Sequence, residues 1–101
     1  MFDYRLKVAS ILLYAKFIGN GEFEVYQYYI IRSTDEQDEK VGVIDSFSLE
    51  EAHAVAKVRF QDSMNAGETL HTFQANETLS FDENHRLNFP KGEMRSLSKW
   101  A

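Results

Sequence analysis

The sequence predicts a small α+β protein in which an antiparallel β-sheet carries one main helix packed across it. Three observations lead to this prediction. Residues 22–32 form an unbroken run rich in β-branched and aromatic side chains, a capped amphipathic stretch begins at Ser48, and short strand-like runs separated by turn residues follow that stretch. The expected order of elements is β-β-β-α-β followed by a β-hairpin.

Length and composition set the domain count. The chain has 101 residues, of which 44% are hydrophobic and 27% charged, and this is typical of one soluble globular domain. We therefore predict a single domain over residues 1–101. The absence of cysteine excludes a disulfide scaffold, a thiolate zinc site and a cysteine nucleophile. A small chain without disulfides is typical of the cytoplasm, and we expect a cytoplasmic protein with no cofactor and no membrane segment.

The N-terminal residues 1–17 have the outline of a signal peptide, with two bases before an apolar stretch. Asp3 lies in the basic region, Lys16 closes the apolar stretch and no small-residue cleavage site follows, so we expect the segment to belong to the fold. Residues 4–18 fit a strand better than a helix, because a helix would split its polar face. The Gly-Asn-Gly sequence at residues 19–21 then predicts a hairpin turn into the next strand.

That next strand is apolar on both faces over its second half. Tyr29 and Ile31 share one face, while Tyr26, Tyr28 and Ile30 share the other. Such a strand is either central and covered on both sides, or has one face available to a partner or a second copy. The two tyrosines are suited to an interface, although the N-terminal segment could equally cover them.

An acidic loop is predicted after this strand, because residues 33–40 contain no apolar side chain. Residues 41–47 resume as a short strand, so the two strands form a hairpin around an acidic tip. The acids of this tip are Asp35, Glu36, Asp38 and Glu39.

The main helix is predicted to begin at Ser48 and to run through Ala66, with Gly67 as a left-handed cap. Ser48 and Glu51 have the spacing of a capping box, in which each side chain accepts from the backbone N–H of the other residue. The face expected to be buried comprises Ala52, Val55, Ala56, Phe60 and Met64.

Three short elements are expected after the helix. Residues 69–75 read as a strand, and residues 78–81 with 86–89 read as a last hairpin. Pro90 ends this hairpin, and residues 91–101 are predicted to form a short docking turn or a loose tail.

The charge pattern bears on possible partners. The formal net charge is −5, and the bases are scattered, which argues against direct binding of nucleic acid because such proteins usually carry a basic stripe. Only residues 86–99 are locally basic, so binding through this segment is a third and minor hypothesis. A true mimic of nucleic acid would carry a denser negative charge.

Catalytic and metal-binding motifs are missing from the sequence. There is no nucleophile elbow and no phosphate-binding loop, and His85 beside Asp82 and Glu83 lacks the spacing of a metal site. An alternative function remains open: His53 and His71 could line a cleft between helix and sheet in a small-ligand-binding or enzymatic domain.

We therefore predict a non-enzymatic protein-binding module that docks on a basic protein surface, without catalytic or metal-binding residues. Homodimerisation through the sheet is a further possibility. In size, acidity and lack of motifs the chain is similar to many inhibitors from phages and mobile elements, including some anti-CRISPR proteins, but no motif assigns it to a family. The predicted partner-binding residues are Glu22, Glu24, Tyr26, Tyr28, Asp35, Glu36, Asp38 and Glu39.

Overall fold

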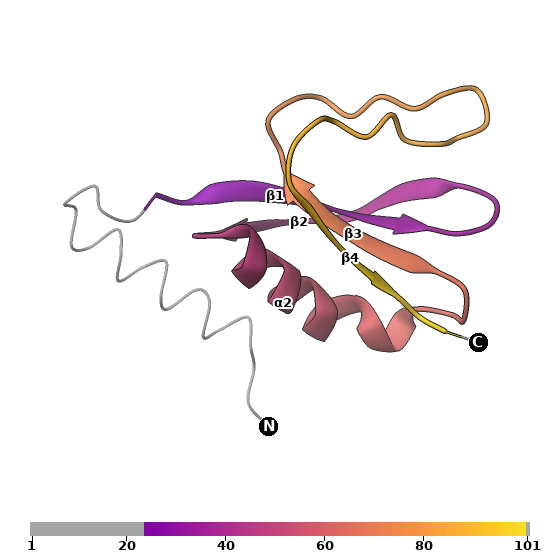
Figure 1. Ribbon diagram of the computed structural model, residues 1–101, viewed down its shortest axis with the longest axis horizontal. Helices are drawn as coiled ribbons and strands as arrows, with labels where there is room; N and C mark the ends of the chain where they lie inside the picture. The colour runs from indigo at the N-terminus through magenta and orange to yellow at the C-terminus, as the bar shows by residue number, and fades with distance from the viewer. Residues whose placement is uncertain (1–23, 101) are drawn as a thin grey trace.

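The computed structural model describes residues 24–100 and contains a four-stranded sheet with one α-helix packed on it (Figure 1). The elements are β1 (Tyr26–Ser33), β2 (Asp38–Ser46), α2 (Leu49–Phe60), the 3₁₀ turn η1 (Gln61–Ser63), β3 (Thr69–Gln74) and β4 (Met94–Ser98). The strand order is β2-β1-β3-β4, and every neighbouring pair is antiparallel. The predicted fold class is confirmed. The strand or helix expected over residues 4–18 lies outside the described residues.

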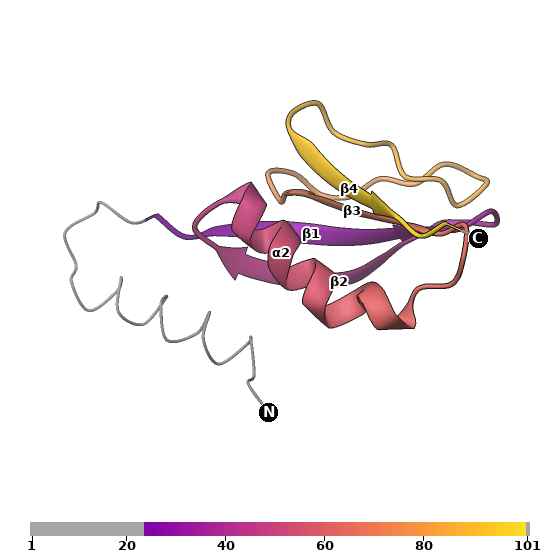
Figure 2. The same ribbon diagram turned by 60° about the horizontal axis from the view of Figure 1, so that its bottom comes forward.

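Strand β1 lies inside the sheet and is covered on both faces, which is the first of the two alternatives that its apolar faces allowed. Tyr28 and Ile30 belong to a core cluster under α2, whereas Ile31 belongs to a second cluster with Phe73 and Leu87. Figure 2 shows α2 lying across one face of the sheet, and the long connection between β3 and β4 lies on the other side (Figure 1). The helix and this connection therefore supply the two covers.

Helix α2 begins where the sequence predicts, because the Ser48 hydroxyl oxygen accepts a hydrogen bond from the Glu51 N–H at 3.1 Å. On the reciprocal side of the capping box, the buried Glu51 Oε1 has no hydrogen-bond partner within residues 24–100. The helix also ends earlier than predicted, at Phe60. The Ser63 hydroxyl donates to the Phe60 carbonyl oxygen, and Met64 turns to an extended backbone that buries its side chain. Gly67 has the expected positive φ of 86°, but in the turn that follows η1.

The second half of the chain departs from the prediction at three places. Strand β2 begins at Asp38, three residues early, because that carboxylate is drawn into the protein. The predicted last hairpin is reduced to one bridge between Phe81 and Leu87. The prediction of a short docking turn or loose tail over residues 91–101 is wrong, because β4 pairs with β3 along its whole length, with Leu97 beside Leu70. No helix within residues 24–100 is long and apolar enough to cross a membrane.

Candidate functional site

The turn between β1 and β2 presents two acidic side chains on a hydrogen-bonded loop. Thr34 Oγ1 accepts from the backbone N–H groups of Glu36 and Gln37, at 3.2 and 3.1 Å. The Thr34 N–H in turn donates to the Gln37 carbonyl oxygen at 2.8 Å. The turn is therefore fixed by its own backbone, and the side chains of Asp35 and Glu36 are exposed at its tip.

A second acidic turn, residues 82–85, is built in a similar way. One oxygen of the Asp82 carboxylate accepts from the N–H groups of Asn84 and Arg86, at 2.8 and 3.0 Å. His85 takes a positive φ of 61° to close the turn. Asp82 is therefore occupied in holding the loop, and the exposed Glu83 occupies its tip.

Asp38 joins these two turns, although they are far apart in the sequence. One of its carboxylate oxygens accepts from the Leu87 N–H at 2.8 Å, and the other lies 3.2 Å from the Arg86 guanidinium. The same guanidinium donates to the Thr34 carbonyl oxygen at 2.7 Å, and the Asp38 N–H donates to the His85 carbonyl oxygen at 2.9 Å. These four hydrogen bonds place the two acidic turns side by side.

The charge of Asp38 is maintained by these contacts. Burial by itself raises the pKa of the carboxyl, but hydrogen bonds from Ser33, Leu87 and Arg86 and the charge of Arg86 outweigh it, so that the pKa lies below its usual value. Asp38 is only 8% exposed. It supports the two turns from inside, and it is not available as the partner-binding acid that the sequence predicted.

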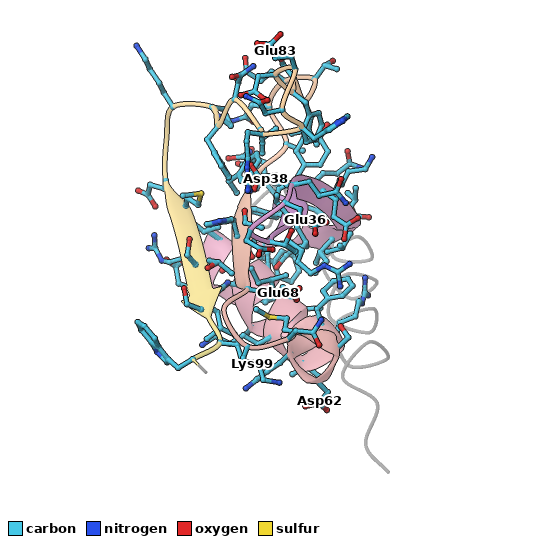
Figure 3. The ribbon with its side chains drawn as sticks, turned by 90° about the vertical axis from the view of Figure 1, so that its right-hand side faces the viewer. Glu36, Asp38, Asp62, Glu68, Glu83 and Lys99 are labelled. Atoms are coloured by element: carbon cyan, nitrogen blue, oxygen red, sulfur yellow. The ribbon has the colours of Figure 1, made fainter. Side chains whose placement is uncertain are left out.

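Further acids lie on the same end of the molecule. In Figure 3, Glu83, Glu36, Glu68 and Asp62 lie along the end that faces the viewer, and Lys99 lies between Glu68 and Asp62. The Glu68 carboxylate accepts a hydrogen bond from the Asn65 backbone N–H at 2.9 Å, and this bond is the main reason that the pKa of Glu68 is lowered. A hydrogen bond from the Asn65 side chain and the charges of Arg32 and Lys99 lower it further. We define the acidic end as Asp35, Glu36, Asp62, Glu68 and Glu83.

Part of this surface could not be predicted from the sequence. Glu83 carried a local signal, since it lies in a polar turn with Asp82. Asp62 and Glu68 carried none, because they reach the acidic end only through the packing of α2 and the turn that precedes β3.

The other predicted partner-binding residues do not join the acidic end. Glu39 pairs with Arg32. Glu24 accepts a hydrogen bond from the hydroxyl of Tyr26, the first residue of β1. Because a strand rises about 3.3 Å per residue, this pair lies roughly 25 Å from the β1–β2 turn. Tyr28 is only 4% exposed beneath α2, and burial is the main reason that its pKa is raised. Glu22 lies outside the described residues.

The two histidines do not share a cleft. His53 Nδ1 lies 3.1 Å from Thr72 Oγ1 on the helix side of the sheet, whereas His71 Nδ1 lies 2.7 Å from Ser96 Oγ. The His71 ring also packs edge-on against Phe89 on the opposite side. Because successive side chains of a strand point to opposite faces, His71 and Thr72 hold the two imidazoles apart. The predicted pairing of His53 with His71 is therefore wrong.

A hollow of about 1070 Å³ lies where β3 ends, and it contains neither histidine. Its aromatic wall includes Tyr28, Phe73 and Phe89, and its polar wall includes Asn76 and Asn88. Within the described residues, no group of three or more His, Asp or Glu side chains is placed to hold a metal ion. The lining also includes Glu50, Glu77 and Glu93.

The locally basic segment, residues 86–99, does not form a basic stripe. Arg86 points inward to Asp38, Arg95 donates to Glu50 at 2.6 Å, and the Lys99 ammonium donates to the Met64 carbonyl oxygen at 2.9 Å. Three of the bases in this segment are therefore engaged with groups of the protein itself.

The fold and this surface define a class: a small acidic α+β protein with a four-stranded antiparallel sheet and one α-helix on it. Comparison of the chain with protein-family models, with curated proteins and with solved structures gives no match. The function is therefore argued from the arrangement of its own residues.

Proposed function

We propose that the protein is a non-enzymatic binding module whose acidic end docks on a basic surface of a protein partner. The observation that supports this proposal is the buried link through Asp38 and Arg86, which joins two acidic turns into one surface. Both turns are also closed by internal hydrogen bonds. Carboxylates on fixed loops lose less conformational freedom on binding than carboxylates on a mobile chain.

Electrostatics would act mainly on the rate and specificity of docking. Opposite charges steer the encounter of two proteins and disfavour partners of the same sign. Within the described residues, no ion pair holds Asp35, Glu36 or Glu83, so these carboxylates are available to cations of a partner. The expected consequence is an association that weakens as salt rises.

The biological effect we propose is inhibition by contact. A module of this size that occupies a basic surface would block whatever that surface binds, including nucleic acid. In size and charge the protein is similar to many phage and mobile-element inhibitors, including some anti-CRISPR proteins. We further propose a cytoplasmic location, because the sequence contains no cysteine and therefore needs no oxidising compartment.

The test is affinity capture from host lysate with three baits that differ only in surface charge. The first is the natural sequence. The second is D35N/E36Q/E83Q, which removes three charges from the acidic end. The third is E24Q/D45N/E77Q, which removes three charges from exposed positions outside the acidic end and includes the predicted contact residue Glu24.

We expect the natural sequence and the third bait to recover the same basic protein, and the second bait to lose it. Loss by the third bait alone would move the binding surface to the start of β1. Equal recovery by all three baits would show that charge at the acidic end does not direct binding. Failure of all three baits to recover any protein would overturn the proposal of a protein-binding module.

A further inference from the structure

The outer edge of β4 lacks the devices that usually prevent strands from pairing. Exposed edges are normally protected by charged side chains, proline or a bulge. Strand β4 contains one charged residue, Arg95, and its register with β3 runs without a shift. Within residues 24–100, no strand pairs with the other side of β4. Among the described residues, this edge of β4 is therefore unpaired.

The hydrogen bonds at the end of β4 show which backbone groups point outward. The Lys99 N–H donates to the Glu68 carbonyl oxygen at 2.9 Å, and the Lys99 carbonyl oxygen accepts from the Gly67 N–H at 2.7 Å. Both groups of Lys99 therefore point toward the β3 side. Because this direction alternates along an antiparallel strand, the N–H and C=O groups of Met94, Ser96 and Ser98 point to the outer edge.

We propose that a second copy of this chain pairs with that edge, antiparallel to β4, around a two-fold axis at Ser96. This register pairs β4 along its whole length. Ser96 faces Ser96 of the second copy, and Met94 faces Ser98 on both sides of the axis. Each of these pairs exchanges two backbone hydrogen bonds, so the outward groups of β4 are satisfied and the two sheets become continuous.

Side-chain charge favours a second copy in this register. On each side of the axis, Glu93 lies opposite Lys99 of the other copy, and opposite charges facing each other across a strand pair stabilise it. The Glu93 side chain is 81% exposed. The Lys99 ammonium donates to the Met64 carbonyl oxygen, which uses only one of its three donors.

Apolar side chains flank the same edge. Trp100 is 87% exposed, and Met94 and Phe89 are 40% and 39% exposed. The proposed register brings Trp100 of one copy opposite Gly92 of the other, next to Met94. Burial of large apolar side chains at this place adds a hydrophobic contribution to the backbone pairing. The strand is short, so the dimer is expected to be weak and to depend on concentration.

Sedimentation equilibrium over a wide concentration range, with the full chain, tests this assembly. Trp100 is the only tryptophan, so its fluorescence reports independently on burial at the edge. We expect dimers to form as concentration rises, with a blue shift of the emission over the same range. A monomer up to about millimolar concentration, the weak limit of specific association, would overturn the proposal.

Two double variants test the register. M94K/S98K places like charges opposite each other on both sides of the axis, whereas M94K/S98E places opposite charges there. Both remove the same side chains, including the Ser98 hydroxyl that contacts Thr69. The charged pair occurs twice, once on each side of the axis, so we expect the first variant to dimerise roughly tenfold more weakly than the second. Equal dimerisation of the two variants would place the contact elsewhere.

A cysteine provides the last test, because the natural sequence has none. Paired residues at the axis are about 5.5 Å apart between Cα atoms, a separation that a disulfide spans. We expect S96C to form a covalent dimer under mild oxidation, and the exposed control S63C to remain a monomer. Cross-linking of both variants alike would indicate random collision and contradict the register. The charge variants of the acidic end leave this edge unchanged, so the assembly and the proposed function are tested separately.

Discussion

The two edges of the sheet are built in opposite ways. Strand β2 has four charged residues among nine and a bulge at Val41, because Ile30 pairs with Gly42 while Ile31 pairs with Lys40. Strand β4 has one charge among five residues and no shift in register. The β2 edge is thus protected against pairing and continues into the acidic end, whereas the β4 edge is open. The two edges of one sheet therefore differ in how readily they would pair with another strand.

The largest effect on stability should come from Asp38, which anchors the start of the β2 edge. We expect D38A to lower the free energy of unfolding by about 3 kcal/mol, because it leaves the buried Leu87 N–H without its acceptor and the Arg86 guanidinium without its ion-pair partner. Urea unfolding at neutral pH measures this. The matched control is E36Q in the adjacent exposed turn, which should change stability by less than about 0.5 kcal/mol. Similar losses in both variants would mean that the Asp38 contacts do not hold the turns together.

Acid should act on the same anchor. The pKa of Asp38 is lowered in the folded protein, while in the unfolded chain it is about 3.9. The stabilisation is therefore present above pH 3.9 and is lost as pH falls through the lower, folded value. We expect the natural sequence to lose more unfolding free energy than D38N between about pH 5 and 2, measured by urea unfolding. Parallel curves for the two proteins would contradict the assigned direction.

A smaller effect is expected at Gly42, where β2 meets the helix. A Cβ placed on Gly42 would lie 3.0 Å from Cζ of Phe60, so the ring must shift. We expect G42A to destabilise the protein by about 1 kcal/mol. The comparison variant is V43A, at a partly exposed position on the other face of β2, which should cost less. If G42A were neutral, the packing of α2 against this edge would be looser than the structure indicates.

The sequence contained enough information for the fold class but not for the site. The start of α2 could be predicted because Ser48 caps it locally. The two apolar faces of β1 left two possibilities open, a central strand or a strand with one face available to a partner. Strand β4 could not be predicted, because Met-Arg-Ser-Leu-Ser lacks the β-branched and aromatic residues that favour strands. Its pairing with β3 makes it a strand.

The candidate site depends on contacts that no local pattern encodes. Asp38 lies in an acidic run of the sequence and was therefore predicted to be an exposed surface carboxylate. Only the return of the chain at Arg86 and Leu87 makes it an internal anchor. The same holds for the histidines, since the alternation that put His71 beside Phe73 did not reveal which face α2 covers.

Moderate acidity should affect the β4 side of the sheet before the β2 side. Burial is the main cause that lowers the pKa of His71, and the charge of Asp38 opposes this shift. Burial also lowers the pKa of His53, where the charges of Lys57 and Arg95 add to the effect. The unfolded chain, with imidazole pKa values near 6.5, therefore binds protons more readily than the folded protein. The contribution of the two histidines to the free energy of unfolding is fully present above pH 6.5 and is lost as the pH decreases through their lowered pKa values in the folded protein.

This is the smallest effect we predict, and it appears between about pH 7 and 5, above the range in which Asp38 titrates. We expect H71Q, at the contact with Ser96 on β4, and H53Q each to flatten the pH dependence of urea unfolding in this range. A decrease in stability that persists in H53Q/H71Q would mean that other groups titrate there. Since His71 contacts the strand whose edge we propose to dimerise, its protonation should also weaken that dimer, which sedimentation at pH 7.5 and 5.5 would reveal.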